Sequence, residues 1–192
     1  MNVVVGVDLA GVETRPTGFC RLAGMSAETC LLFTDEEILN KTRQISPAIV
    51  AIDAPLSLPP GRTTLEDRNG EHFRPCDREL MKRGIRFFPI TLGPMRKLTI
   101  RGIGLKKMLK ADGLTAVEAY PGGAQDILGV PRKQQGLEKL REGLANLGIR
   151  GLKRQMSDHE LDAVTCAYVG KLYLEGKAAF YGVLNDGILM PK

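Results

Sequence analysis

Three acidic residues each end a short apolar run: Asp8, Asp53 and Glu118. Continuous apolar runs are typical of buried strands in parallel sheets, and ligand sites form beyond the carboxyl ends of such strands. If the strand at 3–8 lies beside and parallel to the strand at 49–53, Asp8 and Asp53 are neighbours. Each acid alone has an ordinary explanation in a turn or an ion pair, but three repeats of one pattern favour a site.

A late helix adds two more carboxylates. Ser157 and Glu160 form a capping box, which predicts a helix that begins there and runs to about residue 174. Asp158 and Asp162 are four residues apart and so share a face, while most of this helix is apolar and predicted to be buried. A buried carboxylate needs a charged partner, and Asp162 has two alternatives: an Arg or Lys, or a divalent cation held jointly with the strand-end acids.

Clustered carboxylates without cysteine suit hard cations such as Mg²⁺ or Mn²⁺. Two such ions roughly 3.5–4 Å apart can clamp the attacking and leaving oxygens of a phosphodiester. His159 stands between the two helical acids, where it could pass a proton to the leaving group. A histidine at a helix start is more often a surface or capping residue, so both interpretations remain open.

The elements that must position these acids alternate along the chain. Strand patterns cover 3–8, 17–23, 28–33, 49–53 and 115–118, and helical patterns cover 34–44, 76–82, 96–109, 122–128, 135–147 and 157–174. A small hairpin is expected at the end, around Asn185-Asp186-Gly187, and a turn at Asn69-Gly70. This order predicts an α/β fold with a mixed sheet of about five strands, three antiparallel and then parallel, flanked by helices.

The middle of the chain is basic. Residues 60–110 contain thirteen Lys and Arg against five Asp and Glu, whereas the rest of the chain is mildly acidic. Such a segment suggests a polyanionic partner, in which Arg74, Arg78 and Arg83 would contact phosphates. The alternative is a solvated helical surface, and Arg78 could equally pair with Asp53 or Glu118.

Composition excludes several classes. The 192 residues are 43% hydrophobic and 26% charged, which argues against disordered, fibrous and membrane proteins. No apolar run approaches the ~20 residues of a membrane span, and the first residues do not resemble a signal peptide, so a cytoplasmic location is expected. The cysteines at 20, 30, 76 and 166 lack the spacing of a zinc site.

Five short motifs that contain the candidate residues follow one another along the chain. They are Gly-Val-Asp8-Leu-Ala-Gly, Ala-Ile-Asp53-Ala-Pro-Leu, Arg74-Pro-Cys-Asp77-Arg78-Glu-Leu, Val-Glu118-Ala-Tyr-Pro and Asp158-His-Glu-Leu-Asp162-Ala. Together, from about residue 3 to 175, they resemble the DUF429 family of predicted nucleases with an RNase H-like fold. The resemblance implies a core set of Asp8, Asp53 and Asp162, with Asp158 as a fourth acid. Glu118 is then an extra acid or a brace.

The leading hypothesis is therefore a single RNase H-like domain over 1–192, with a basic helical insertion at about 58–112. It would be a metal-dependent nuclease, a hydrolase that uses Mg²⁺ or Mn²⁺ on nucleic acid. One alternative is a non-catalytic module of the same fold that binds nucleic acid or protein. A phosphotransferase of the sugar-kinase type shares the core topology, but it needs two such halves, and this chain is too short for them.

Overall fold

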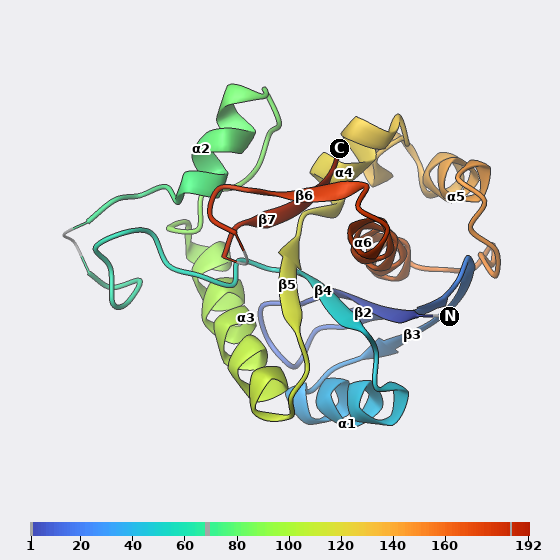
Figure 1. Ribbon diagram of the computed structural model, residues 1–192, viewed down its shortest axis with the longest axis horizontal. Helices are drawn as coiled ribbons and strands as arrows, with labels where there is room; N and C mark the ends of the chain where they lie inside the picture. Colours follow the sequence, from blue (N-terminus) through green and yellow to red (C-terminus); the bar gives the residue numbers. More distant parts are fainter. Residues whose placement is uncertain (1, 68–69, 185) are drawn as a thin grey trace.

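A mixed seven-stranded sheet forms the centre of the protein (Figure 1). The computed structural model describes residues 2–67, 70–184 and 186–192. The strands are β1 (Val3–Asp8), β2 (Thr17–Ala23), β3 (Ser26–Leu32), β4 (Ile49–Asp53), β5 (Ala116–Ala119), β6 (Ala178–Tyr181) and β7 (Ile188–Pro191). Their order across the sheet is β3-β2-β1-β4-β5-β7-β6.

Strand directions agree with the sequence prediction, but the strand number does not. Strands β1, β2 and β3 pair antiparallel, and β4 and β5 continue parallel to β1. The terminal hairpin forms β6 and β7, and β7 joins the sheet parallel to β5. The expected five strands become seven because the two strands of the terminal hairpin extend the sheet, with β7 paired to β5.

Helices cover both faces of the sheet (Figure 1). They are α1 (Asp35–Ile45), α2 (Pro75–Lys82), α3 (Gly93–Ala111), α4 (Pro121–Leu128), α5 (Leu137–Asn146) and α6 (Asp158–Leu174), with a short 3₁₀ turn, η1, at Lys133–Gln135. Helices α4, α5 and α6 pack in one hydrophobic core, and α1 and α3 pack in the core on the other side. No helix in the described ranges is both long and apolar enough to span a membrane.

Alternation along the strands decides which face each side chain meets. In β1, Val4 packs toward α6, whereas Val5 and Val7 pack toward α1 and α3. In β4, Ile49 and Ala51 pack toward α6 in the same way. Because side chains alternate with a period of two, every position in register with these residues can be assigned to a face.

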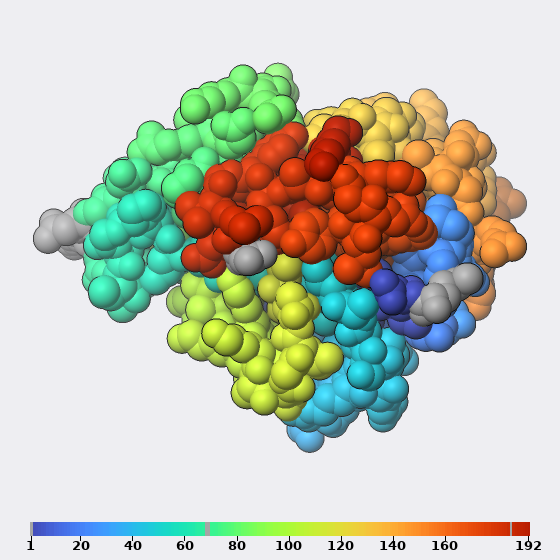
Figure 2. Space-filling model, in the orientation of Figure 1, coloured from blue at the N-terminus to red at the C-terminus, as the bar shows by residue number. Residues whose placement is uncertain are grey.

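The segment between β4 and β5 contains α2 and α3 and forms one flank of the molecule (Figure 2). Helix α2 packs through Cys76 and Leu80 against Ile188 and Met190 of β7. The predicted turns at 69–70 and 185–187 each include an asparagine that lies outside the described residues. All four cysteines are free thiols.

Candidate active site

Asp8 and Asp53 end two neighbouring parallel strands and lie directly opposite each other in the β1–β4 register. Asp8 has the same strand phase as Val4, and Asp53 has the same phase as Ile49 and Ala51. Both carboxylates therefore project from the face that α6 covers. The sequence prediction that these two acids become neighbours is confirmed by this register.

Two glycines allow α6 to approach this edge of the sheet closely. A Cβ atom at Gly6 would lie 2.1 Å from the carbonyl oxygen of Ala163, and one at Gly18 would lie 1.9 Å from that of His159. Any side chain at either position would push the helix away from the sheet. Because the helix and the sheet are in such close contact, the first turns of α6, which contain Asp158 and Asp162, lie near the end of β1.

The predicted capping box fixes where α6 begins. The Ser157 hydroxyl accepts from the Glu160 backbone, and the Glu160 carboxylate accepts from the Ser157 backbone at 2.9 Å. One turn further along, Asp162 is buried, with only 4% of its surface exposed. We call Asp8, Asp53, Asp158 and Asp162 the acid cluster.

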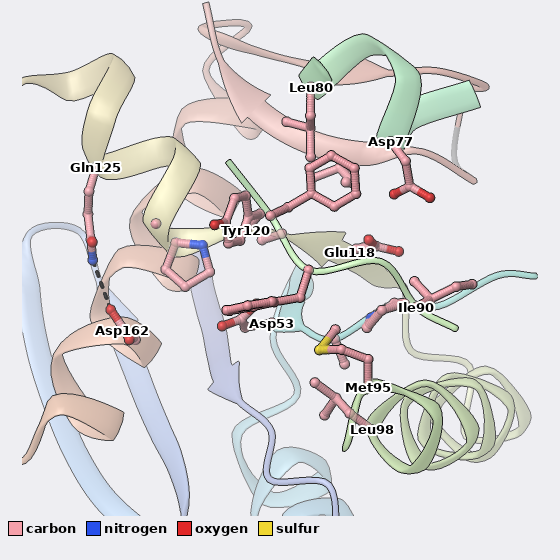
Figure 3. A pocket seen from close by; sticks show the side chains of 18 of the residues that line it. Asp53, Asp77, Leu80, Ile90, Met95, Leu98, Glu118, Tyr120, Gln125 and Asp162 are labelled. Atoms are coloured by element: carbon pink, nitrogen blue, oxygen red, sulfur yellow. Dashed lines mark hydrogen bonds between the residues drawn. The ribbon is translucent and has the colours of Figure 1, made fainter. Parts of the chain in front are cut away.

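Three polar side chains contact the acid cluster. Lys133, in η1, donates to Asp162 Oδ2 at 2.9 Å, and its Nζ lies 3.3 Å from Asp158 Oδ2. Gln125, in α4, donates through Nε2 to Asp162 Oδ1 at 2.9 Å (Figure 3). His159 Nδ1 lies 2.7 Å from Asp8 Oδ2. Asp162 thus has the cationic side-chain partner that its burial requires, and that partner is a lysine.

Negative charge nevertheless exceeds positive charge here. Burial, together with the nearby Asp8 and Asp162 carboxylates, raises the pKa of Asp53 well above its ordinary value. Burial also raises the pKa of Asp162, an effect that Lys133 opposes only in part. The raised pKa values of Asp53 and Asp162 mean that their charged forms are disfavoured, and an added cation beside these two carboxylates would stabilise them.

The pKa values of His159 and Asp158 shift in the directions that favour their charged forms. The bond to Asp8 raises the pKa of His159. For Asp158, burial is outweighed by His159 and Lys133, so the pKa of Asp158 is lowered. Both shifts favour the charged forms, and a protonated His159 would balance part of the charge on Asp8.

The carboxylate oxygens of the acid cluster are suitable ligands for a hard divalent cation, but the Lys133 ammonium already occupies the position beside Asp158 and Asp162. Carboxylate oxygens are the ligands preferred by Mg²⁺ and Mn²⁺. Within the described part of the chain, no three His, Cys, Asp or Glu side chains are arranged to hold a metal ion. The Lys133 ammonium and the His159 ring already hold Asp162 and Asp8. A cation bound by Asp162 Oδ2 would have to displace Lys133.

Glu118 does not join the acid cluster. It pairs in register with Ile52, which faces α1 and α3, so its side chain leaves the sheet on the other face. Arg74 donates to both Glu118 oxygens, at 2.6 and 2.8 Å, and the Leu56 backbone N–H donates to one of them at 2.8 Å. Arg74 also donates to both oxygens of Asp77. We call Arg74, Asp77 and Glu118 the arginine brace.

The three arginines expected at phosphates have different surroundings. Arg74 is buried and fully used by the brace, whereas Arg78 is exposed on α2 and Arg83 is exposed directly after it. Arg78 pairs with Glu71, and Arg83 pairs with Glu79. Only Arg74 of these three lines the cavity beside the acids.

Lys133 and Gln125 are the site residues that sequence reasoning did not identify. Neither belongs to a motif, and both lie in segments without strong periodicity. The available signal was indirect: a carboxylate on an apolar helix requires a cationic partner. Nothing in the sequence indicates which Lys or Arg satisfies that requirement.

A cavity of about 290 Å³ opens beside the cluster (Figure 3). Asp53, Asp162 and Lys133 line one end of it, and the brace lines another part. The remaining wall is largely apolar and comes from α2, α3 and the loop between them, from the segments that follow β4 and β5, and from β7. The acids are therefore reachable from a defined cavity.

Solved structures with this fold include two of Thermus thermophilus RuvC. One is described as RuvC in complex with a Holliday junction substrate; it shares 14% identity, with a TM-score of 0.57, over 92% of this chain and 96% of that chain. The other, RuvC alone, shares 15% identity, with a TM-score of 0.52, over 91% and 96%. These similarities establish an RNase H-like fold.

Sequence comparisons give the family. No curated protein sequence matches this chain. A family model described as "Protein of unknown function (DUF429)" matches residues 6–185, which is nearly the whole chain. The expected resemblance is thereby confirmed, and the protein belongs to the DUF429 family.

Proposed function

We propose that this protein is a metal-dependent nuclease that hydrolyses phosphodiester bonds of nucleic acid. The observation that carries the proposal is the acid cluster, in which two strands and one helix bring four carboxylates together, and two of them, Asp53 and Asp162, line a cavity. Two cationic partners, Lys133 and His159, contact it. The similarity in fold to RuvC, one structure of which holds a Holliday junction, supports nucleic acid as the substrate class.

Asp8, Asp53 and Asp162 would hold Mg²⁺ or Mn²⁺, and Asp158 would supply a fourth carboxylate. When bound, such ions activate water and stabilise the leaving oxygen of a phosphodiester. Lys133 would move from Asp162 to the substrate phosphate, and Gln125 would keep Asp162 oriented. His159 would donate a proton to the leaving oxygen, a role that suits its raised pKa.

Phosphates further along the strand would meet exposed cations. Arg78 and Arg83 keep this role in the proposal, since both are exposed, Arg78 on α2 and Arg83 directly after it. Arg132 would add a contact next to Lys133 at the cavity. Arg74 is excluded from it, because its five donors serve the brace and a neighbouring serine.

The test is cleavage of labelled duplex, junction and single-stranded DNA and RNA in Mg²⁺, Mn²⁺ or EDTA. We expect metal-dependent cleavage by the wild type, reduced about 10³-fold or more in Asp8→Asn/Asp162→Asn. Circular dichroism should show that the variant is folded. Cleavage by a folded double variant at the wild-type rate would contradict the proposal.

One observation favours a second candidate, a nucleic-acid-binding protein without catalysis. Lys133 and His159 already satisfy Asp162 and Asp8, and the described residues contain no ready metal-binding group. This alternative expects nucleic-acid binding that is salt-sensitive, unaffected by EDTA and not followed by cleavage.

A further inference from the structure

The cavity beside the acid cluster has a wall that phosphodiester hydrolysis does not require. This wall is lined by Leu80 of α2 and by Met95 and Leu98 of α3 (Figure 3). The loop that connects the two helices adds Phe87 and Phe88. Tyr120, directly after β5, adds a third aromatic ring. A basic backbone-binding groove needs no such apolar surface.

The polar groups of this cavity are mostly engaged with one another. The brace satisfies Arg74, Asp77 and Glu118 internally. The Tyr120 hydroxyl donates to the Arg86 carbonyl, and Gln125 donates to Asp162 and to Thr165. A group entering the apolar end would therefore be held by packing and stacking rather than by many hydrogen bonds.

Three consecutive polar residues also line the cavity. Arg132, Lys133 and Gln134 follow one another along its rim, with Lys133 on the acids and the Arg132 guanidinium 5.7 Å from the centre of the Tyr120 ring. Arg132 also pairs with both carboxylate oxygens of Asp126, so this segment places one cation on the acids and the next beside an aromatic ring of the wall. A ligand with a phosphate next to a flat, apolar group matches this order.

We propose that the cavity receives one unstacked nucleobase, from the nucleotide next to the phosphate that the acid cluster engages. This inference rests on the proposed function. About 290 Å³ is near the small end of ligand cavities, which span roughly 300–1,000 Å³, so it suits one base with its sugar and not a stacked pair. Phe87, Phe88 and Tyr120 supply aromatic faces for stacking, which every base can use.

The proposal limits the substrates that can react. A base inside a continuous duplex would have to leave its stack, which is easiest at an end, a mismatch, a junction or a single strand. We therefore expect preference for such sites and only weak dependence on which base enters, because the wall offers few hydrogen-bonding groups.

The test is fluorescence anisotropy of the full-length protein with labelled 12-nucleotide single strands of DNA and RNA, in Ca²⁺ and in EDTA. Strands with one abasic residue, moved stepwise along the sequence, report where a base is needed. Met95→Trp fills the cavity, and Phe88→Ala removes a ring that is 72% exposed and so should not affect folding. Ile100→Trp, on an exposed residue of α3 outside the cavity, is the matched control.

We expect one abasic position to weaken wild-type binding about tenfold, as loss of one stacked base does. Met95→Trp and Phe88→Ala should bind the intact strand about tenfold more weakly and lose sensitivity to that position, whereas Ile100→Trp should match the wild type. If every abasic strand binds within twofold of the intact strand, or if both variants keep the abasic penalty, the base pocket is wrong and the nuclease proposal stands. If no oligonucleotide binds in either Ca²⁺ or EDTA, the base pocket and the nuclease proposal are both wrong.

Discussion

The arginine brace and the acid cluster both contribute side chains to the same cavity, yet they differ in how their charge is satisfied. In the arginine brace, each of the four carboxylate oxygens accepts at least one hydrogen bond from Arg74, and Leu56 adds another. In the acid cluster, the pKa of Asp53 is raised by burial and by neighbouring acids. The brace is complete by itself, whereas in the cluster the negative charge of four carboxylates exceeds the positive charge of their partners Lys133 and His159.

This difference separates structural acids from functional ones. A closed set of partners stabilises a fold but leaves nothing for a ligand. An incomplete set costs stability, and proteins retain such sites where a cation or substrate completes them. Asp53 ends β4, and Glu118 is the residue before the last one of β5, but only Asp53 belongs to the acid cluster, where burial and neighbouring acids raise its pKa.

The largest expected effect comes from breaking the brace. Arg74→Met removes the partner of two buried carboxylates, which should lower the free energy of unfolding by about 3–5 kcal/mol. Urea denaturation measures the loss. The control Arg78→Met removes an exposed pair with Glu71 and should cost less than about 1 kcal/mol. Equal losses in the two variants would contradict a structural role for the brace.

Neutralising one carboxylate of the acid cluster should raise the free energy of unfolding, in contrast to the loss expected from the brace. In EDTA at pH 7, Asp53→Asn should raise the free energy of unfolding by about 1–2 kcal/mol, because it removes a buried charge that its neighbours oppose. Since the folded-state pKa of Asp53 is raised, wild-type stability falls as pH rises through that pKa. The advantage of the variant should therefore vanish at acid pH, and an advantage independent of pH would argue against this cause.

Substitution of Lys133 tests whether its ammonium group occupies the position that a bound metal ion would take. Lys133→Met frees Asp162 and Asp158 from their ammonium partner. We expect Mn²⁺ to bind about tenfold more tightly, measured by calorimetry, because the ion no longer displaces a competing charge. Lys177→Met, an exposed lysine paired with Glu175, is the control. Weaker Mn²⁺ binding in the Lys133 variant would mean that Lys133 assists the ion instead.

The smallest effect concerns His159. Because the pKa of His159 is raised by Asp8, the pair stabilises the fold below the ordinary value of 6.5, and this contribution is lost as pH rises through the folded-state pKa. His159 is partly exposed, so His159→Asn should cost at most about 0.5 kcal/mol at low pH. Denaturation at several pH values measures it, and a cost that grows with pH would contradict the pairing.

The strand-end acids could be predicted because strand phase and parallel pairing are local properties of the sequence. The runs before Asp8 and Asp53 indicate buried strands, and the capping box at Ser157 locates the helix that brings Asp162. The position of Glu118 could have been refined in the same way, since it is one residue out of phase with Asp53 in the β4–β5 register.

The long-range pairings could not be predicted. Lys133 contacts Asp162 from a short 3₁₀ turn, and Arg74 reaches Glu118 across 44 positions of sequence. Such contacts depend on how loops close over the sheet, which no periodicity records. The attachment of β7 to β5 has the same origin, because it is decided by packing at the sheet edge.

The most direct test of the central claim is a Mn²⁺ titration by calorimetry on the wild type, on Asp8→Asn/Asp162→Asn and on Asp77→Asn in the brace. Each protein is titrated alone and with an oligonucleotide carrying phosphorothioate linkages, since substrate phosphates can complete a metal shell. The account predicts that the wild type and the brace variant bind Mn²⁺ and that the cluster variant does not. Equal binding by the cluster variant, or no binding by the wild type in either condition, would contradict it.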